Sequence, residues 1–221
     1  MILKPLTEYN MEQVRLWRHQ VPETLRTPYM LTEEMQQQYY RDVICNRNST
    51  TRYWALWERI VTQGWSDGGA YKVKRSYDTF VGYGGIENIS WANSIGEMSL
   101  LISPDHWWEG FGREAVGLFL EQAFMHMGLK YVYGECYECG PYGFWKKMLE
   151  AYGGRYTWLW ARKYYDGRYW DSYYFTFSAA DYRNSTRPRR KQADPAEEHP
   201  GLSRTTYPDL YTPSPEGLPA V

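Results

Sequence analysis

The sequence lacks several features that would mark a secreted or membrane-bound protein. No stretch of its 221 residues approaches the ~18 consecutive apolar residues that a membrane-spanning helix needs. The first ten residues, MILKPLTEYN, contain no basic segment followed by a long apolar run, so no secretory signal is visible. Three cysteines are too few, and odd in number, for a disulfide framework. We therefore expect a cytoplasmic protein without a membrane span.

Net charge and phenylalanine are also scarce. A formal charge of −1 argues against a protein that coats nucleic acid by bulk electrostatics. Only 7 residues are Phe, against 22 Tyr and 11 Trp, so most aromatic side chains carry a polar group on an apolar body. Two interpretations fit this excess: aromatic pairs across the strands of a β-rich domain, or a ligand cleft lined by aromatic rings. A hydrophobic fraction of 43% suffices for a folded core.

Composition changes once, near Ala179. The segment 179–221 is rich in proline, loses apolar periodicity and balances its basic and acidic residues. We predict a folded domain over 1–178 and a Pro-rich, disordered tail over 179–221. The tail contains a basic cluster, RPRRK at 187–191, which would suit phosphate or another acidic partner.

Periodicity and turn residues predict an α/β (α+β) order of elements, β-α-α-β-β-β-α-β-α-β-β, across the first 178 residues. Asn10 is the predicted N-cap of the first helix and Thr32 opens the second. The polar, Gly-rich segment 62–78 is expected to be a loop or a protruding hairpin. The predicted strands cover 2–6, 52–60, 79–88, 95–103, 130–137, 155–165 and 168–177, and the helices cover 11–19, 32–44, 112–127 and 141–152.

The segment that carries chemistry is SLLISPDHWWEGFGREAV, residues 99–116. Gly110 and Gly112 stand where a helix opens directly after a strand and a short loop. Glycines let the backbone approach a ligand, and the first N–H groups of a helix are unpaired with the positive end of the dipole behind them. This arrangement is typical of a phosphate-binding site.

The same segment resembles the coenzyme-A-binding motif of the GCN5-related N-acetyltransferases, the GNAT superfamily. The family pattern, [Q/R]-x-x-G-x-[G/A] at the start of a long helix, falls on residues 107–112. The chain is most similar to the RimJ/RimL branch, including its closing DGRYWDSYYFTF hairpin. The resemblance implies a mixed, centrally splayed sheet of about seven strands with about four helices. It also implies an acyltransferase that passes an acetyl group from acetyl-CoA to a primary amine, by direct attack on the thioester in a ternary complex.

The resemblance also implies which residues hold the cofactor. Backbone groups of the splayed strand would contact the thioester and pantetheine, and groups at the helix start would contact the diphosphate. The former are Leu101 and Ile102, and the latter are Trp107, Gly110, Phe111, Gly112, Arg113 and Glu114. Trp107 stands where the family has Gln or Arg, so one side-chain contact to the diphosphate is lost.

The acid–base residues are less firmly indicated. Glu97, on the strand before the phosphate loop, is the preferred general base, with Glu87 as the alternative. Trp145 aligns with the family's tyrosine acid, and an indole N–H donates a hydrogen bond but is no useful acid. Tyr142, one turn earlier, is a substitute acid. No metal site is expected, because the spacing of Cys136 and Cys139 does not match CxxC, and His106 is expected to be a solvated loop residue.

The acceptor is not determined by any motif. A small-molecule amine, a peptide N-terminus and a modified nucleotide all remain open, as do a monomer and a homodimer. Two further readings stay open: an acyltransferase-fold enzyme that modifies a nucleic-acid base, with Tyr and Trp stacking on it, and a degenerate member that binds coenzyme A or a partner without catalysis.

Overall fold

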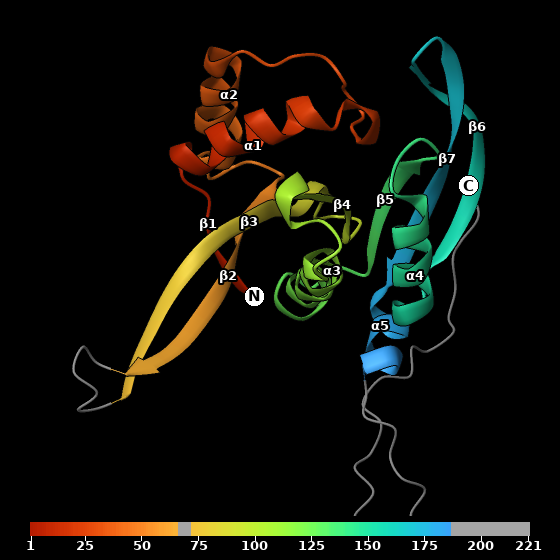
Figure 1. Ribbon diagram of the computed structural model, residues 1–221. Helices are drawn as coiled ribbons and strands as arrows, with labels where there is room; N and C mark the ends of the chain where they lie inside the picture. Colours follow the sequence, from red (N-terminus) through yellow and green to blue (C-terminus); the bar gives the residue numbers. More distant parts are fainter. Residues whose placement is uncertain (66–71, 187–221) are drawn as a thin grey trace, which may run out of the picture. The chain divides into compact units, whose positions relative to one another are not determined.

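The computed structural model describes residues 1–65 and 72–186, which include seven strands and five α-helices. The strands form one sheet in the order β1-β2-β3-β4-β5-β7-β6 (Figure 1). The elements are β1 (Ile2–Pro5), α1 (Glu8–Gln20), α2 (Glu33–Tyr39), β2 (Arg52–Trp65), β3 (Lys72–Ser90), β4 (Ile95–Ile102), α3 (Phe111–Glu121), β5 (Tyr131–Tyr137), α4 (Tyr142–Tyr152), β6 (Arg155–Tyr165), β7 (Arg168–Ser178) and α5 (Ala179–Thr186). The predicted fold class and the order of the first eleven elements are confirmed.

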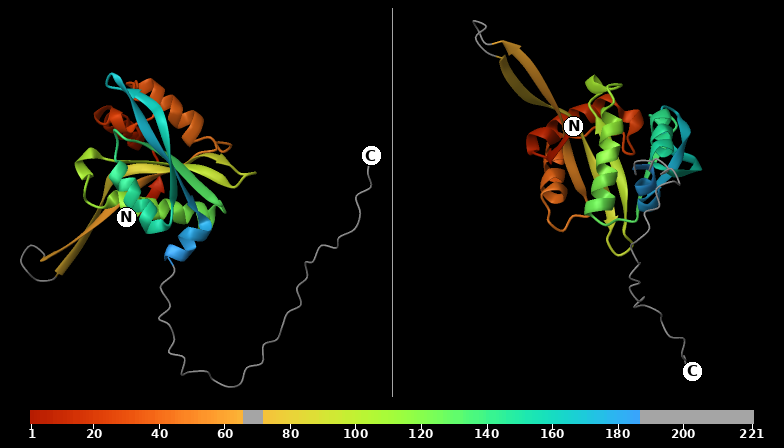
Figure 2. Two further views of the ribbon diagram at one scale, coloured as in Figure 1. Left: turned by 90° about the vertical axis from the view of Figure 1, so that its right-hand side faces the viewer. Right: turned by 90° about the horizontal axis from the view of Figure 1, so that it is seen from below.

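Helices α1 and α2 lie together on one face of the sheet (Figures 1 and 2). Val14 and Trp17 of α1 are buried with Tyr83 of β3 and Leu101 of β4. The prediction that Asn10 caps α1 is wrong by one turn, because Thr7 is the N-cap. The side-chain Oδ1 of Asn10 accepts a hydrogen bond from the backbone N–H of Thr7. This reciprocal capping box explains why the apolar periodicity begins only after the helix has started.

Helices α3, α4 and α5 lie on the opposite face and cover the larger core. Phe119 of α3 and Phe175 and Phe177 of β7 are completely or almost completely buried there. Helix α4 ends at Gly153, whose φ of 73° is the left-handed conformation that glycine adopts readily. Because the two faces carry separate clusters, each face of the sheet is fixed by its own set of helices.

Within the polar segment 62–78, the described residues 62–65 and 72–78 are paired strands, in line with the hairpin alternative. β2 and β3 stay paired from Arg52↔Ile86 out to Trp65↔Lys72, and in Figure 1 the two strands leave the helices behind as a ribbon. The described ladder therefore extends beyond the two predicted strands, which covered 52–60 and 79–88. No helix in the described ranges is long and apolar enough to cross a membrane.

The predicted tail begins later than expected. Residues 179–186 form α5, and its Ala179 and Tyr182 are buried against the core, with Tyr182 beside Phe124 and Tyr152. The boundary at residue 178 is thus too early by about two turns, because two apolar contacts on a short helix leave little periodic signal. The rest of the predicted tail, including the basic cluster at 187–191, lies outside the described residues.

The sheet opens at its centre. β4 and β5 run parallel and pair over three positions only, from Ile95↔Tyr131 to Glu97↔Tyr133. Beyond Glu97 the two strands diverge, and β4 keeps its pairing with β3 as far as Ile102. The predicted central splay is therefore present, with its narrow end at Glu97 and its open end toward the start of α3.

Candidate active site

The start of α3 has the backbone geometry of an anion site. Gly110 is the N-cap, with φ of 91° and no atom within 4 Å of where a Cβ would stand. The first bond of the helix ladder runs from the Glu114 N–H to the Gly110 carbonyl, at 3.3 Å. The N–H groups of Phe111, Gly112 and Arg113 therefore precede that ladder and are available to a phosphate.

Glu114 departs from the prediction at this site. We expected its N–H to contact the diphosphate, but that group already bonds to Gly110, because the helix ladder begins there. Its carboxylate Oε1 lies 2.5 Å from the amino nitrogen of Met1. Glu114 is thus committed within the protein, and the predicted cradle is shortened to the three preceding residues.

Two tryptophans flank the phosphate loop in different ways. Trp107, which stands at the family's Gln or Arg position, donates its indole N–H to the Ile102 carbonyl at 3.0 Å. This bond ties the loop back to the end of β4 and uses one of the backbone oxygens predicted to contact pantetheine. Trp108 is 99% exposed and has a φ of 70°, which is uncommon for a residue with a side chain. No pattern in the sequence indicated this orientation of Trp108.

The beginnings of α3 and α4 lie against each other. A Cβ at Gly112 would stand 3.1 Å from the ring of Phe144, in the first turn of α4. Glycine at 112 therefore lets the two helix starts pack closely, because a Cβ there would press on the Phe144 ring. The contact places the first turn of α4, with Tyr142, beside the start of α3.

The predicted acid residues differ in their surroundings. Trp145 is buried, and its ring stacks on Phe175 with centroids 4.5 Å apart, so it packs as a core residue. Tyr142 is half-buried and stacks on Tyr173 at 4.0 Å, with Trp158 edge-on to it. The part that either residue takes in chemistry stays a prediction.

Two glutamates face each other at the narrow end of the opening. Glu87 of β3 and Glu97 of β4 are paired in register, and Tyr83 and Leu101 of the α1/α2 face continue the same alternation. Glu97 is buried, and both of its oxygens are engaged: Arg26 contacts the two oxygens and Asn88 donates to Oε2 at 2.9 Å. Glu97 is thus a buried carboxylate that is paired with Arg26.

Glu87 has a different electrostatic environment. Burial raises the pKa of its carboxyl above the usual glutamate value, and the hydrogen bond from Tyr53 and the charges of Arg26 and Arg18 only partly oppose the effect of burial. The nearby Glu97 charge raises the pKa further. A carboxylate with a raised pKa holds a proton more readily, which suits a group that accepts one near neutral pH.

The remaining candidate groups lie outside this arrangement. His106 contacts Glu109 in the loop, with Nδ1 and Oε2 3.0 Å apart. The Cys139 thiol donates to the Glu23 carbonyl at 3.3 Å, and burial raises the pKa of Cys136 to about 12, so neither is a ready thiolate. In the described part of the chain no three His, Cys, Asp or Glu residues converge as a metal site would need.

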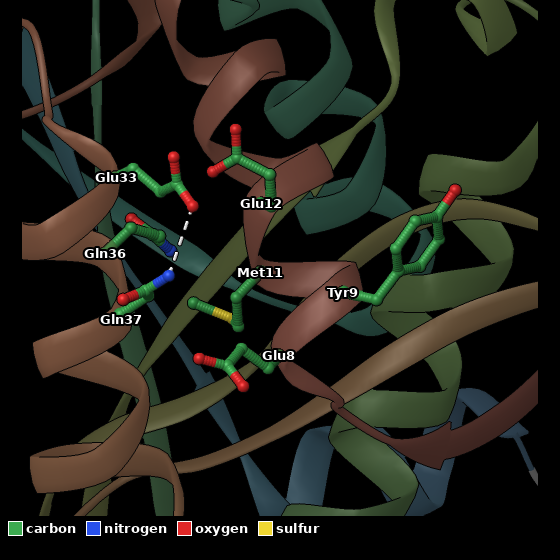
Figure 3. A pocket seen from close by; sticks show the side chains of 7 residues that line it. All are labelled: Glu8, Tyr9, Met11, Glu12, Glu33, Gln36 and Gln37. Atoms are coloured by element: carbon green, nitrogen blue, oxygen red, sulfur yellow. Dashed lines mark hydrogen bonds between the residues drawn. The ribbon is translucent and has the colours of Figure 1, made fainter.

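A separate cavity of about 200 Å³ lies between α1 and α2 (Figure 3). Its polar lining includes the bond from Gln37 Nε2 to Glu33 Oε1, at 3.2 Å. None of the predicted site residues lines it: the lining consists of Glu8, Tyr9, Met11, Glu12, Glu33, Gln36 and Gln37. The sheet opening and this cavity are therefore distinct features.

Comparison with known families decides what this fold is. A family model described as the acetyltransferase (GNAT) domain matches residues 1–138, more than half of the chain. The chain belongs to the GNAT acetyltransferase family. Family membership makes it an acyltransferase with acetyl-CoA as co-substrate. The start of α3 fits that co-substrate, because three N–H groups and an open approach at Gly110 meet where a diphosphate would lie.

Solved structures confirm the GNAT fold. The chain is similar to spermidine N-acetyltransferase from Vibrio cholerae in complex with CoA and spermine, with a TM-score of 0.64, 16% identity, and coverage of 83% of this chain and 98% of that one. A chimera of that enzyme, SpeG, with hSSAT gives a TM-score of 0.63 at 17% identity, with the same coverage. No curated protein matches the sequence. At such identity the likeness concerns the fold.

Sequence reasoning missed two residues that the structure places beside Glu97, namely Arg26 and Glu135. Arg26 lies between α1 and α2, and its Nη2 is 3.8 Å from Oε2 of Glu135 on β5. Glu135 also bonds to Arg162 at 3.2 Å and to Ser172 at 2.7 Å. The one available signal was a charged residue inside the otherwise apolar β5 segment, YVYGECY.

Proposed function

We propose that the chain transfers the acetyl group of acetyl-CoA to a primary amine by direct attack within a ternary complex. The observation that carries this proposal is the opening between β4 and β5. It has the start of α3, with its unpaired N–H groups, at its wide end, and buried Glu97 opposite half-buried Glu87 at its narrow end. Acetyl-CoA supplies an activated thioester. The protein has to hold it, deprotonate the amine and return a proton to sulfur.

Glu87 fits the role of proton acceptor better than Glu97, although the sequence favoured Glu97. The Glu97 oxygens are taken by hydrogen bonds from Arg26 and Asn88, which leaves them less accessible to a proton from the amine. Glu87 lies opposite it with a pKa raised by burial. An alkylammonium with a pKa of about 10.4 must lose a proton before its nitrogen attacks. In this proposal Glu87 receives that proton, directly or through water.

The leaving sulfur requires a proton donor at the other side of the opening. Tyr142 carries the hydroxyl on the first turn of α4, which the contact between Phe144 and Gly112 holds beside the start of α3. As the new C–N bond forms and the C–S bond breaks, the Tyr142 hydroxyl would protonate the thiolate. Trp145 would support α4 through its packing on Phe175.

The acceptor class follows less directly. The solved neighbours include a spermidine N-acetyltransferase in complex with CoA and spermine, which makes aliphatic amines the first acceptors to test. Within the family we assign the chain to the RimJ/RimL branch on its closing hairpin sequence, 166–177, which places peptide N-termini second. Amino groups of nucleotides come third.

Release of free thiol from acetyl-CoA tests the proposal. We expect binding of acetyl-CoA by thermal shift, and thiol release that depends on an added amine from a panel of aliphatic amines, peptides, nucleotides and DNA. Binding without turnover on any acceptor would contradict the proposal and support a non-catalytic coenzyme-A-binding member. Turnover on nucleic acid alone would support the base-modifying reading instead.

A further inference from the structure

Arg26 compensates two buried carboxylates from outside the sheet. Its guanidinium contacts both oxygens of Glu97 and lies 3.8 Å from Glu135, across the point where β4 and β5 separate. The side chains of Glu97 and Glu135 are each 7% exposed, whereas that of Arg26 is 52% exposed. A solvent-facing cation thus covers two acids that are otherwise shielded from water.

These acids lie where an acceptor amine would have to bind. Glu97 is the last paired residue of β4 before the opening, and Glu135 projects from β5 on the same face, two residues after Tyr133. A primary amine reaches the protein as an ammonium ion at neutral pH. The groups that would attract it are the two carboxylates that Arg26 already occupies.

We propose that Arg26 determines acceptor specificity by occupying the ammonium position beside Glu97 and Glu135, so that a cationic acceptor binds only by displacing its guanidinium. The inference rests on the proposed function for the reaction, but its binding step can be measured without turnover. The displaced side chain would move into solvent, where half of it already lies. Displacement therefore requires a rotamer change rather than unfolding of the segment.

The main chain that carries Arg26 is held from the other side. Lys163 of β6 is only 6% exposed, and its Nζ donates to the carbonyls of Pro22, Glu23 and Leu25 at 3.1, 2.7 and 2.6 Å. Three charge-assisted hydrogen bonds to this one turn hold its backbone in place. Lys163 is in this sense a positioning residue that keeps the Arg26 backbone at the opening while its side chain exchanges.

The two carboxylates keep other partners when Arg26 leaves. Asn88 still donates to Glu97 at 2.9 Å, and Arg162 and Ser172 still bond to Glu135. An ammonium that replaces the guanidinium would therefore meet two carboxylates that keep hydrogen-bond donors of their own. The other titratable or charged groups around the cluster are Arg18 of α1, Glu87 of β3, Tyr133 and Tyr137 of β5 and Tyr174 of β7.

Calorimetric titration with putrescine, at mildly alkaline pH and without acetyl-CoA, tests the binding step. We expect Arg26→Gln to bind this diamine at least ~10-fold more tightly than the parent protein, about 1.4 kcal/mol. Arg59→Gln is the matched control. Arg59 is equally exposed at 54% and also pairs with a carboxylate, Asp78, but it lies on the β2–β3 ribbon. Unchanged or weaker binding by Arg26→Gln, or the same gain in Arg59→Gln, would overturn the inference.

Steady-state kinetics separate this inference from the proposed function. For an amine that the parent protein acetylates, Arg26→Gln should lower KM, because the amine no longer has to displace the guanidinium. A raised KM would overturn the inference while the proposed function stands. Tighter putrescine binding, with no turnover by the parent protein or any variant, would contradict the proposed function but support the inference about the ammonium position.

Arg26→Lys is the second variant, needed if Arg26→Gln does not fold. Lysine keeps the charge but loses the planar fork that spans both Glu97 oxygens. We expect a smaller gain in putrescine affinity, in the same direction. No gain in this variant would also count against displacement.

Discussion

Glu87 and Glu97 lie directly opposite one another on β3 and β4, yet only Glu97 is held by an arginine. The two carboxylates lie on the same face of the β3–β4 pair, but different side chains surround them. Arg26 contacts both oxygens of Glu97, whereas burial raises the pKa of Glu87. When two neighbouring acids have different surroundings, one can bind a cationic group while the other accepts a proton.

Replacing the proposed base is the first prediction. Glu87→Gln keeps the shape of the side chain and removes its basicity, so kcat/KM for an alkylamine should fall ~10²–10⁴-fold. The loss should shrink as pH rises, because more of the amine then arrives without its proton. Steady-state rates over a pH series provide the measurement, with the exposed Glu121→Gln on α3 as control.

The parallel variant of Glu97 distinguishes the two carboxylates. If Glu97 acts through its pairing with Arg26, Glu97→Gln should alter KM more than kcat and should lack the relief at high pH. The assignment of the base to Glu87 would be contradicted if Glu87→Gln kept the parent rate while Glu97→Gln lost activity that recovers at high pH. Glu97 would then be the base, as the sequence indicated.

A second prediction concerns the acid limb of the pH–rate profile. The pKa of Glu87 is raised mainly by burial, and the hydrogen bond from Tyr53 lowers it in part. Activity that needs ionised Glu87 therefore declines as pH falls through this raised pKa. Tyr53→Phe removes the lowering bond, so the limb should move to still higher pH. Tyr77→Phe, an exposed tyrosine on the ribbon, should leave it in place, and an unmoved limb in Tyr53→Phe would argue against Glu87.

Cofactor binding depends on the open approach at the start of α3. Gly112→Asp places a negative charge beside the N–H groups of Phe111 and Arg113, and we expect coenzyme A to bind at least ~10-fold more weakly, about 1.4 kcal/mol or more. The substitution also presses on Phe144 at 3.1 Å. Gly112→Ala makes the same contact without charge and isolates the packing effect. Equal affinities of the Asp and Ala variants for coenzyme A, measured by calorimetry, would contradict the assignment of the start of α3 as the diphosphate site.

The two aromatic residues of α4 should respond differently. Tyr142→Phe keeps the ring stacked on Tyr173 but loses the hydroxyl, so kcat should fall while the melting temperature stays near that of the parent. Trp145→Phe thins the packing on Phe175 and should lower stability by about 1–3 kcal/mol, with little effect on kcat. The opposite pattern would assign the sulfur-facing role to Trp145.

The sequence predicted most of the fold because its signals are local. The Gly153 cap and the Thr32 cap each act within a few residues. The strand–loop–helix at 99–116 likewise indicated the cofactor end of the site. Capping and short-range periodicity depend on neighbours along the chain, so one sequence reports them.

The acceptor side could not be predicted because it is built from residues far apart in sequence. Arg26 meets Glu97 across 71 positions, and Lys163 meets Leu25 across 138. No spacing rule connects such pairs. The same limit explains why the sequence favours Glu97 as the general base. Its partner Arg26 lies in a segment that carries no periodic pattern.

The central claim is acetyl transfer from acetyl-CoA to an amine at the opening between β4 and β5. Mass spectrometry of a reaction containing acetyl-CoA and a mixed amine library tests it most directly, when free coenzyme A is quantified in the same sample. The account predicts a mono-acetylated amine formed in equal amount with free coenzyme A, and neither product above background with Gly112→Asp. Coenzyme A release without any acetylated amine, or no release at all from a sample that binds acetyl-CoA, would contradict it.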